Sequence, residues 1–481
     1  MVGGAAATDR SRLKVLFASA ELSPIARVGG LGEAAAGLVV ALREEGVTVD
    51  LVLPDYYGTE MEDERSRQLN VPGWAEPATA RQGIVAGVGE VTLVAVPGIA
   101  RPHPYIDEQG TGWPDNDHRF FAFSAAVAGL MAETDADVVH LNDWHTGGAL
   151  AMAWQRPPAA FTIHTLGYQG WAGGHWLAQM PYHHGAFECF GDVNPLAGAI
   201  QVAERVITVS PNYADEIRRP ESGMGLDHIL NALGDRLVGI RNGIDTAIWN
   251  PTADPLIAAN FTADDLAGKE KCRADLLATA GWEDDGTPVI GVVTRLVDQK
   301  GIDLVLEALQ FAPTVPFRLV MLGSGSRSLA DRARWASGNW PNHMYFDSTY
   351  NQPLAHKIFA GSDLLLMPSR FEPCGLAQMQ AMAYGTIPVV SDVGGLHDTV
   401  VDADSDRTNG TGFHTTTIDV PGIIDGVHRA VRAWRHKQRR QAIQRRGMRK
   451  DWSWARPARR HIALYDEIAI KNETAGLPRE T

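Results

Sequence analysis

Short, uniformly apolar runs recur along the chain, separated by segments with helical periodicity or by glycine turns. The first series reads LKVLFA, VDLVLP, VTLVAVPG, ADVVHLN, AAFTIHT and RVITVS, and a second reads PVIGVVT, FRLVMLG, HMYFDS, DLLLMPS and TIPVVS. Runs without polar alternation are typical of parallel strands whose two faces are both covered by helices. The pattern therefore predicts an α/β protein with two doubly wound, Rossmann-like parallel sheets.

The chain has 481 residues, more than a single hydrophobic core usually supports, and the two series of strands indicate where it divides. Between them lies the segment WNPTADPLIAANFTADD, which is polar and contains prolines. We therefore expect a first domain over residues 1–249, a linker over 250–285 and a second domain over 286–451.

Composition and charge narrow the class of protein. Hydrophobic residues make up 45% and charged residues 21% of the chain, and the formal net charge of −14 argues against general nucleic-acid binding. Three scattered cysteines, Cys189, Cys272 and Cys374, favour a reducing compartment over a disulfide framework. The sequence shows neither a secretory signal nor a run of about 18 apolar residues, so we expect a cytoplasmic protein that does not bind membranes.

One basic segment runs against this acidic balance. Residues 428–460 include the stretch RHKQRRQAIQRRGMRK, which by itself is typical of an RNA- or membrane-binding helix. The alternative is a solvated helix face whose apolar residues, Val431, Trp434 and Ile443, pack inward. We favour the second interpretation because the rest of the chain is acidic.

The most informative chemistry lies in the segment PSRFEPCGLAQMQAMAYGTIPVVSDVGGLHDTV. Glycines open a predicted helix at Gly375 and again at the pair Gly394 and Gly395. Backbone N–H groups at the positive end of a helix dipole suit anionic phosphates. Glu372 adds an acceptor for sugar hydroxyls beside them. The combination predicts a nucleotide-sugar pocket.

This segment closely resembles the donor-binding region of bacterial glycogen synthases and plant starch synthases. Other motifs follow in the order of that family: KVLFASAELSPIARVGGLGEAAAGL, HLNDWHTG, FTIHTLGYQG, ITVSPNYADEI, GIRNGIDTAIWNP, TRLVDQKGIDLVLEAL and SWARPARRHIALYDEI. They span residues 14 to about 468. The resemblance implies the two-domain GT-B fold with its active site in the interdomain cleft, a final helix near 452–470 that returns to the first domain, and retaining glycosyl transfer.

The resemblance also implies which residues hold the donor. Charge builds up on the leaving diphosphate in the transition state, so fixed cations there lower the barrier. Arg295 and Lys300, at a strand-to-helix turn, are expected to supply them, and Glu372 is expected to bind the transferred sugar. The remaining donor-binding residues implied are Arg27, Gly29, Gly30, Glu33, Tyr350, Cys374, Gly375, Leu376, Gln380, Gly394 and Gly395.

A second set of residues is expected to contact sugars. His164 follows an apolar strand and should emerge at the carboxyl end of the sheet, where α/β proteins bind ligands. Asp143 is either a hydrogen-bonding partner for sugar hydroxyls or an N-cap of the following helix. The resemblance implies catalytic roles for His164 and Asp143. Together with the aromatic loop after His164, it also suggests acceptor contacts from Glu21, Thr165, Tyr168 and Trp171.

The chain departs from the family pattern at Arg27, Val28, Thr165, Ala197 and Gln380. Our leading hypothesis is transfer of a glucosyl unit from a nucleotide sugar to an α-glucan or maltooligosaccharide. The departures also fit a pseudoglycosyltransferase or modified-sugar transferase of secondary metabolism, which would couple a nucleotide-activated cyclitol or sugar to an (amino)sugar. A third hypothesis is a non-catalytic glucan-binding protein.

No cofactor and no metal are expected, provided that Arg295, Lys300 and the helix N-termini neutralise the diphosphate. A zinc site is an alternative that the histidine-rich loop leaves open, although its spacing matches no familiar ligand pattern. The residues concerned are His175, His183, His184 and Cys189.

Overall fold

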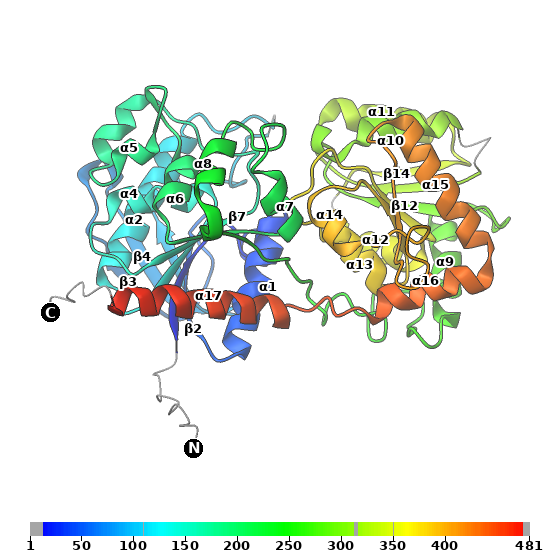
Figure 1. Cartoon of the computed structure of the whole chain (residues 1–481), viewed down its shortest axis with the longest axis horizontal. Helices are drawn as coiled ribbons and strands as arrows, with labels where there is room; N and C mark the ends of the chain where they lie inside the picture. Colours follow the sequence, from blue (N-terminus) through cyan, green and yellow to red (C-terminus); the bar gives the residue numbers. More distant parts are fainter. Residues whose placement is uncertain (1–12, 109, 312–315, 350, 475–481) are drawn as a thin grey trace, which may run out of the picture. The chain divides into compact units, whose positions relative to one another are not determined.

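The computed structural model describes residues 13–108, 110–311, 316–349 and 351–474, and the chain divides into two compact units (Figure 1). Unit 1 comprises Met1–Val209, Ile217–Ile240 and Trp454–Thr481. Unit 2 comprises Ser210–Glu216 and Arg241–Ser453. Each unit is built on its own sheet, as the two series of apolar runs predict.

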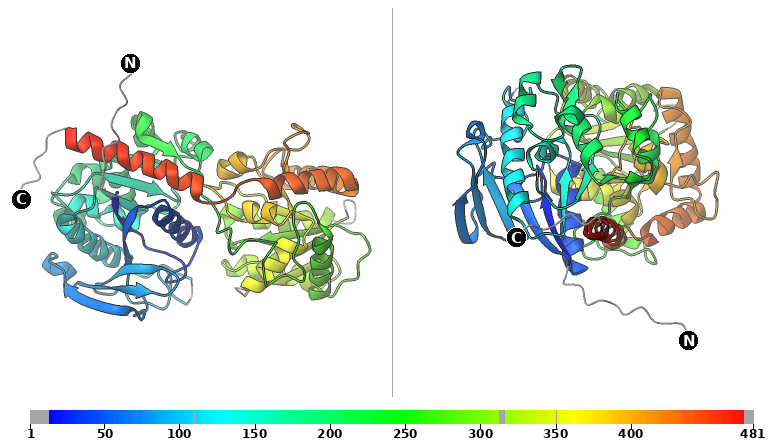
Figure 2. Two further views of the ribbon diagram at one scale, coloured as in Figure 1. Left: turned by 90° about the horizontal axis from the view of Figure 1, so that it is seen from below. Right: turned by 60° about the vertical axis from the view of Figure 1, so that its left-hand side comes forward.

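The sheet of unit 1 has nine strands in the order β11-β10-β7-β6-β1-β2-β5-β4-β3. The strands from β11 to β5 pair in parallel, whereas β4 and β3 add antiparallel pairs at one edge (blue in Figure 2). Every residue of β3 is exposed, so no apolar pattern could have predicted this strand. The bounds are β1 Lys14–Ala18, β2 Thr48–Pro54, β3 Glu62–Gln68, β4 Thr79–Val85, β5 Gly89–Ala95, β6 Val138–Asn142, β7 Ala159–Ile163, β10 Arg205–Thr208 and β11 Leu237–Gly239.

Helices of unit 1 differ in how much of their surface is buried: α1 buries one apolar stripe, whereas α2 is buried without interruption from Arg119 to Ala128. In α1 the buried residues Leu31, Ala35, Leu38 and Leu42 recur at helical spacing. The long final helix α17 packs against α1 and β6. The bounds are α1 Gly30–Glu44, α2 Asn116–Glu133, α3 Trp144–Gly147, α4 Ala149–Met152, α5 His184–Phe187, α6 Pro195–Val202, α8 Asp227–Ala232 and α17 Ala455–Thr474, with the hairpin β8 Glu188–Cys189 and β9 Asp192–Val193.

Unit 2 contains a six-stranded parallel sheet in the order β14-β13-β12-β15-β16-β17. Its strands are β12 Val289–Val293, β13 Arg318–Leu322, β14 Met344–Asp347, β15 Leu364–Met367, β16 Ile387–Val390 and β17 Phe413–His414. Its helices are α7 Pro211–Glu216, α9 Ala267–Thr279, α10 Ile302–Ala308, α11 Arg327–Asn339, α12 Gln352–Gly361, α13 Ala377–Ala383, α14 Gly394–Thr399, α15 Val420–Arg435 and α16 Lys437–Arg449.

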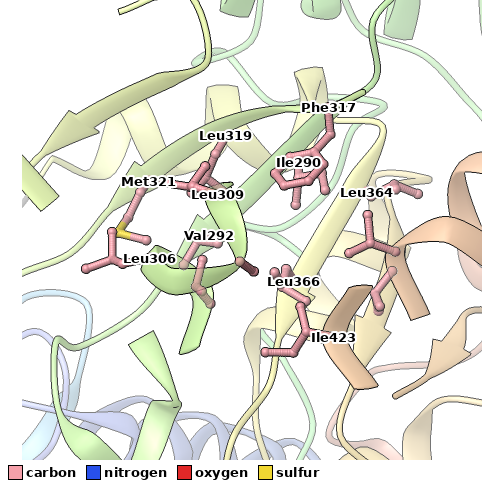
Figure 3. Close-up of a cluster of buried hydrophobic side chains, with 14 of the residues drawn as sticks. Ile290, Val292, Leu306, Leu309, Phe317, Leu319, Met321, Leu364, Leu366 and Ile423 are labelled. Carbon is pink, nitrogen blue, oxygen red and sulfur yellow. The ribbon is translucent and has the colours of Figure 1, made fainter. Parts of the chain in front are cut away.

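The core of unit 2 forms where β12, β13 and β15 meet the helices that cover them. Ile290, Leu319 and Leu364 are fully buried, and they belong to one cluster with Leu306 from α10 and Ile423 from α15 (Figure 3). Burial of this kind contributes about 25 cal/mol per Å² of apolar surface. The strands from which the loops of unit 2 emerge are thus anchored in this core.

Two observations bear on the expected domain boundaries and the basic segment. The expected linker, residues 250–285, lies within unit 2, because α9 packs on α12 and Lys269 of α9 is buried there. The basic segment forms the end of α15 and α16, with Val431, Trp434 and Ile443 buried. Among the described residues, no helix is long and apolar enough to cross a membrane.

Candidate functional site

In unit 1 the predicted residues Asp143 and His164 follow two neighbouring parallel strands, β6 and β7. Asp143 adopts φ +54° and ψ 179°, a backbone conformation that residues other than glycine rarely take. The Oδ1 atom of Asp143 accepts a hydrogen bond of 2.7 Å from the N–H of His164. The strained backbone therefore places a buried carboxyl group under the backbone of His164.

The pKa of Asp143 is raised to about 7, chiefly by burial and further by the negative charge of Glu21, while the N–H groups of His164 and Thr165 oppose the shift. A buried carboxyl group of this kind exchanges a proton near neutral pH. Perturbed groups at strand ends are typical of functional sites. The N-cap interpretation is not supported by a side-chain capping bond.

His164 is neutral, because burial and the neighbouring His461 lower its pKa to about 3. Its Nε2 lies 2.9 Å from Oδ1 of Asn142, while Nδ2 of Asn142 donates to the carbonyl of Ala18 at 2.9 Å. Since the asparagine oxygen accepts, Nε2 of His164 carries the proton and Nδ1 keeps its lone pair. His164 thus offers a neutral ring with an acceptor atom. Asn142, at the end of β6, was not predicted from the sequence.

In the glycine turn before α1, the N–H group of Gly29, which was predicted to bind the donor, is already used by another acceptor. The N–H groups of Val28 and Gly29 already donate to Oε2 of Glu21, at 2.7 and 3.0 Å. Arg27 forms an ion pair with Glu33, so its charge is neutralised within unit 1. An added Cβ at Gly29 or Gly30 would meet no atom within 4 Å. The turn therefore leaves open space at the first N–H groups of α1.

The aromatic loop after His164 is partly packed and partly exposed. Tyr168 and Trp171 expose 60% and 52% of their surfaces, as sugar-stacking side chains would, whereas Trp176 and Phe187 are buried. The hydroxyl of Thr165 accepts from the N–H of Gly167 in a local turn. Among the described residues, no three His, Cys, Asp or Glu side chains cluster as a metal site would require, which includes the proposed zinc ligands.

In unit 2 the strands β12 and β15 are parallel neighbours, so the loops that follow them begin at the same edge of the sheet. Arg295 follows β12, is exposed, and has no ion pair among the residues that the structure describes. Lys300 and Glu372 form an ion pair, and the hydroxyl of Ser369 donates to Oε2 of Glu372 at 3.1 Å. Two cations and a buried carboxylate thus follow two neighbouring strands at this edge of the sheet.

The FEPCGL loop is held by groups that the sequence did not reveal. Gly375 has φ +72°, which favours glycine, and an added Cβ would lie 2.5 Å from Oε1 of Gln378. The Nε2 atom of Gln378 donates to the carbonyls of Cys374 and Gly375. Cys374 is buried, and burial raises the pKa of its thiol to about 12, so it contributes backbone rather than a thiolate.

The second glycine pair serves packing, which corrects the expectation of free N–H groups. An added Cβ at Gly394 would lie 1.9 Å from the carbonyl oxygen of Glu372, and one at Gly395 would lie 2.2 Å from that of Cys374. The N–H of Gly395 donates to the carbonyl of Glu372, and that of Gly394 donates to Oε1 of Glu216 on α7. Both N–H groups are therefore used inside unit 2.

Of the remaining residues predicted to bind the donor, the structure describes Leu376 and Gln380 but not Tyr350. Leu376 is the N-cap of α13, whose first N–H groups have no acceptor within the helix. Gln380 lies on α13 and exposes 5% of its surface. Tyr350 lies outside the described residues. Binding of a donor by Arg295, Lys300, Glu372 and the start of α13 therefore stays a prediction.

Two parallel-sheet units, with cations at one sheet edge and neutral polar groups at the other, define a glycosyltransferase of the GT-B class. Residues 14–232 match the family described as starch synthase catalytic domain, and residues 280–447 match glycosyl transferases group 1. The chain belongs to the glycogen synthase family. This confirms the resemblance and the predicted fold class.

Individual relatives cover nearly the whole chain. Glycogen synthase of Halorhodospira halophila is 39% identical over 95% of this chain and 99% of its own length. Glycogen synthase of Alkalilimnicola ehrlichii is 40% identical over 94% of this chain and 98% of its own. The catalytic domain of starch synthase IV from Arabidopsis thaliana, bound to ADP and acarbose, is 31% identical with a TM-score of 0.86, covering 95% of this chain and 100% of that one.

Proposed function

We propose that the protein transfers a glucosyl unit from a nucleotide sugar to the end of an α-glucan, with retention of configuration. The observation that carries this is the edge of unit 2, where Lys300, Glu372 and the exposed Arg295 gather after adjacent strands. Family membership supports it, since the relatives are glycogen synthases. These relatives do not favour the cyclitol-coupling and glucan-binding alternatives.

The charges of unit 2 suit the leaving group. Transfer breaks the bond between the anomeric carbon and the diphosphate, and negative charge builds up on the departing oxygen. Arg295 and Lys300 stabilise this charge in the transition state. When the diphosphate binds, Lys300 leaves Glu372 and pairs with the diphosphate instead. Glu372 then accepts hydrogen bonds from hydroxyl groups of the sugar. The Lys300–Glu372 ion pair thus keeps both groups ready in the absence of donor.

Unit 1 contributes groups suited to a neutral sugar. His164 is uncharged with an acceptor at Nδ1, and Asp143 is a carboxyl group whose pKa lies near 7. These groups hydrogen-bond hydroxyls of the transferred sugar, and Tyr168 and Trp171 stack on the acceptor. We assign no protein nucleophile. The acceptor hydroxyl attacks the anomeric carbon from the face that the diphosphate leaves, and its proton passes to the diphosphate oxygen.

We further propose that catalysis needs no metal ion, because Arg295 and Lys300 supply fixed positive charge at the diphosphate. Addition of a chelator should then leave the rate unchanged. A rate that falls with the chelator and returns with Mg²⁺ would contradict this part of the proposal.

Mass spectrometry of reaction products tests the function. The purified protein is incubated with ADP-, UDP-, GDP- or dTDP-glucose and maltooligosaccharides of defined length. The proposal predicts extension by one hexose at a time with at least one donor. Nucleotide binding without extension under any donor would instead favour a transferase for a modified sugar or cyclitol.

A further inference from the structure

Unit 1 has an open pocket of about 440 Å³ at the edge of its sheet opposite to His164. Its walls come from the end of α6, the start of β10, the turn before β11 and the last turns of α17. Pro158 precedes β7 and Arg205 begins the parallel neighbour β10, whereas His164 follows β7. The pocket therefore lies at the amino ends of these strands, inside unit 1 alone. Its volume is within the range of about 300–1,000 Å³ that is typical of small-molecule sites.

The lining of this pocket is rich in cations. It includes Arg205, Arg236 and Lys471, together with one acidic residue, Glu204. The carboxylate of Glu204 is already used, because it pairs with Arg156 at 3.0 Å and accepts from the N–H of a β7 residue at 2.6 Å. The acidic residue of the lining thus leaves the three cations of the lining without compensation.

A second carboxylate, Glu467 of α17, is shared by two of these cations. It pairs with Arg205 and, at 2.7 Å, with Lys471. Arg236 has no carboxylate partner among the residues that the structure describes, and it donates instead to the carbonyl of Gln201 at 2.9 Å and to that of Ala203. Around the pocket, four cations thus meet two carboxylates, although the chain as a whole has a net charge of −14.

Arg205 adds an unused donor to this wall. Its side chain exposes 12% of its surface, and within the described part of the chain its buried Nε has no hydrogen-bond acceptor. A buried donor without an acceptor is costly, and a charged one more so. Beside the cations the walls are apolar, with Ala203 and Ile468 both buried. The pocket therefore combines excess positive charge with an apolar surface.

We infer that this pocket binds a small organic phosphate, with the phosphate group against Arg205, Arg236 and Lys471 and an apolar body against Ala203 and Ile468. Guanidinium groups match phosphate oxygens in a bidentate geometry. A phosphate monoester carries about −1.5 to −2 charges at pH 7, which balances the excess of positive charge, whereas a carboxylate balances half of it. The site is separate from the residues of the proposed transfer and does not depend on them.

Arg236 also has a structural role, which the test must separate from binding. Its bonds to the carbonyls of Gln201 and Ala203 satisfy the end of α6, where a cation is favourable. This role accounts for Arg236 alone. It does not explain why Arg205 and Lys471 share one carboxylate at the same pocket.

Phenyl phosphate is a suitable probe, because it joins a phosphate to a small apolar ring. Calorimetric titration of the full chain at low ionic strength should show saturable binding. Benzoate, with one charge on the same ring, should bind about tenfold or more weakly. Inorganic phosphate should also bind more weakly, because it lacks the ring. Equal affinity for benzoate would show that the site does not select phosphate, and equal affinity for inorganic phosphate would show that the apolar wall is not used.

Variants then locate the bound probe. Arg236→Ala should weaken binding by about tenfold or more, since charge-assisted hydrogen bonds are lost. Arg219→Ala removes the same side chain from an exposed position of unit 1 outside the pocket and should bind as the wild type does. Thermal melting establishes that each variant is folded. Should Arg236→Ala not fold, Lys471→Ala decides, because that side chain is 64% exposed; its affinity should fall severalfold.

The cations of unit 2 are a second place where a phosphate could bind, and Lys300→Ala distinguishes the two. That variant should bind phenyl phosphate as tightly as the wild type does. A loss of affinity in Lys300→Ala, with wild-type affinity in Arg236→Ala and Lys471→Ala, would place the probe in unit 2 and overturn the inference. Absence of saturable binding to the wild type would overturn it as well.

Discussion

Units 1 and 2 both place carboxyl groups at the carboxyl ends of parallel strands, but in opposite electrostatic settings. In unit 2, Glu372 is paired with Lys300, and Arg295 is exposed after the neighbouring strand β12. In unit 1, Asp143 has no cationic partner among the described residues, and burial raises its pKa to about 7. We propose that the difference separates two tasks: the cations of unit 2 stabilise the diphosphate, and Asp143 and His164 of unit 1 bind the neutral sugar.

The glycines of the two units show the same contrast. Gly394 and Gly395 in unit 2 are required by packing, since an added Cβ would collide with the backbone of Glu372 or Cys374. Gly29 and Gly30 in unit 1 border open space. Similar sequence motifs, a strand followed by Gly-Gly and a helix, are thus required by packing in one unit and border open space in the other.

The largest effect is expected for Lys300→Ala. Removing a fixed cation at the diphosphate should lower kcat/KM by about 10²–10³-fold. Steady-state kinetics with the accepted donor measure this, and Lys437→Ala on α16 is the matched control for charge. A folded Lys300→Ala enzyme with wild-type kinetics would remove Lys300 from the catalytic set.

Gly395→Ala should disturb the fold of unit 2. Its Cβ would lie 2.2 Å from the carbonyl oxygen of Cys374, and overpacking of this kind costs about 1–3 kcal/mol in the free energy of unfolding. Chemical denaturation measures the loss, and affinity for the nucleotide should fall with it because the FEPCGL loop must shift. Wild-type stability would mean that the loop yields without cost.

Asp143→Asn should lower kcat/KM by about tenfold, since an amide replaces an ionisable group at the sugar. It should also change the pH dependence of stability. The wild-type folded state keeps its proton up to about pH 7, whereas the unfolded chain releases it near pH 4, so wild-type stability falls as the pH rises through this window. The asparagine has no such penalty.

Melting temperatures of wild type and Asp143→Asn, measured at about pH 5 and pH 8, check the sign of this effect. The variant should gain more over the wild type at the higher pH. A gain that is larger at the lower pH would contradict the raised pKa of Asp143.

The smallest effect on stability is expected for Gly30→Ala. Because the added methyl group meets no atom within 4 Å, the free energy of unfolding should stay within about 0.5 kcal/mol of wild type. The donor KM should rise severalfold if Gly30 binds the donor as the family resemblance implies, since the methyl group occupies the open space at this turn. A change in stability without a change in donor KM would reverse the contrast with Gly395.

The parallel strands were readable from the sequence because apolar runs without alternation are a local pattern. Arg295 and Lys300 were singled out by the resemblance to a known family together with their place at a strand-to-helix turn, and their catalytic role stays a prediction. Strand β3 was missed because all its residues are exposed. Its pairing depends on β4, a partner that periodicity within the segment cannot reveal.

The partners of the predicted residues were not readable, because they come from distant parts of the chain. Glu216 bonds Gly394 across 178 positions, and Tyr105 bonds Glu21 across 84. Such contacts decide whether a glycine turn has free N–H groups. The sequence could therefore place the turns but not say which donors remained available.

Anomeric configuration of the product is the most direct test of the account. The enzyme is given an α-linked nucleotide glucose and a maltooligosaccharide, and the new linkage is followed by proton NMR as it forms. The account predicts an α-linked glucosyl unit from the first turnover, with release of the nucleoside diphosphate. A β-linked product, or release of free glucose without transfer, would contradict it.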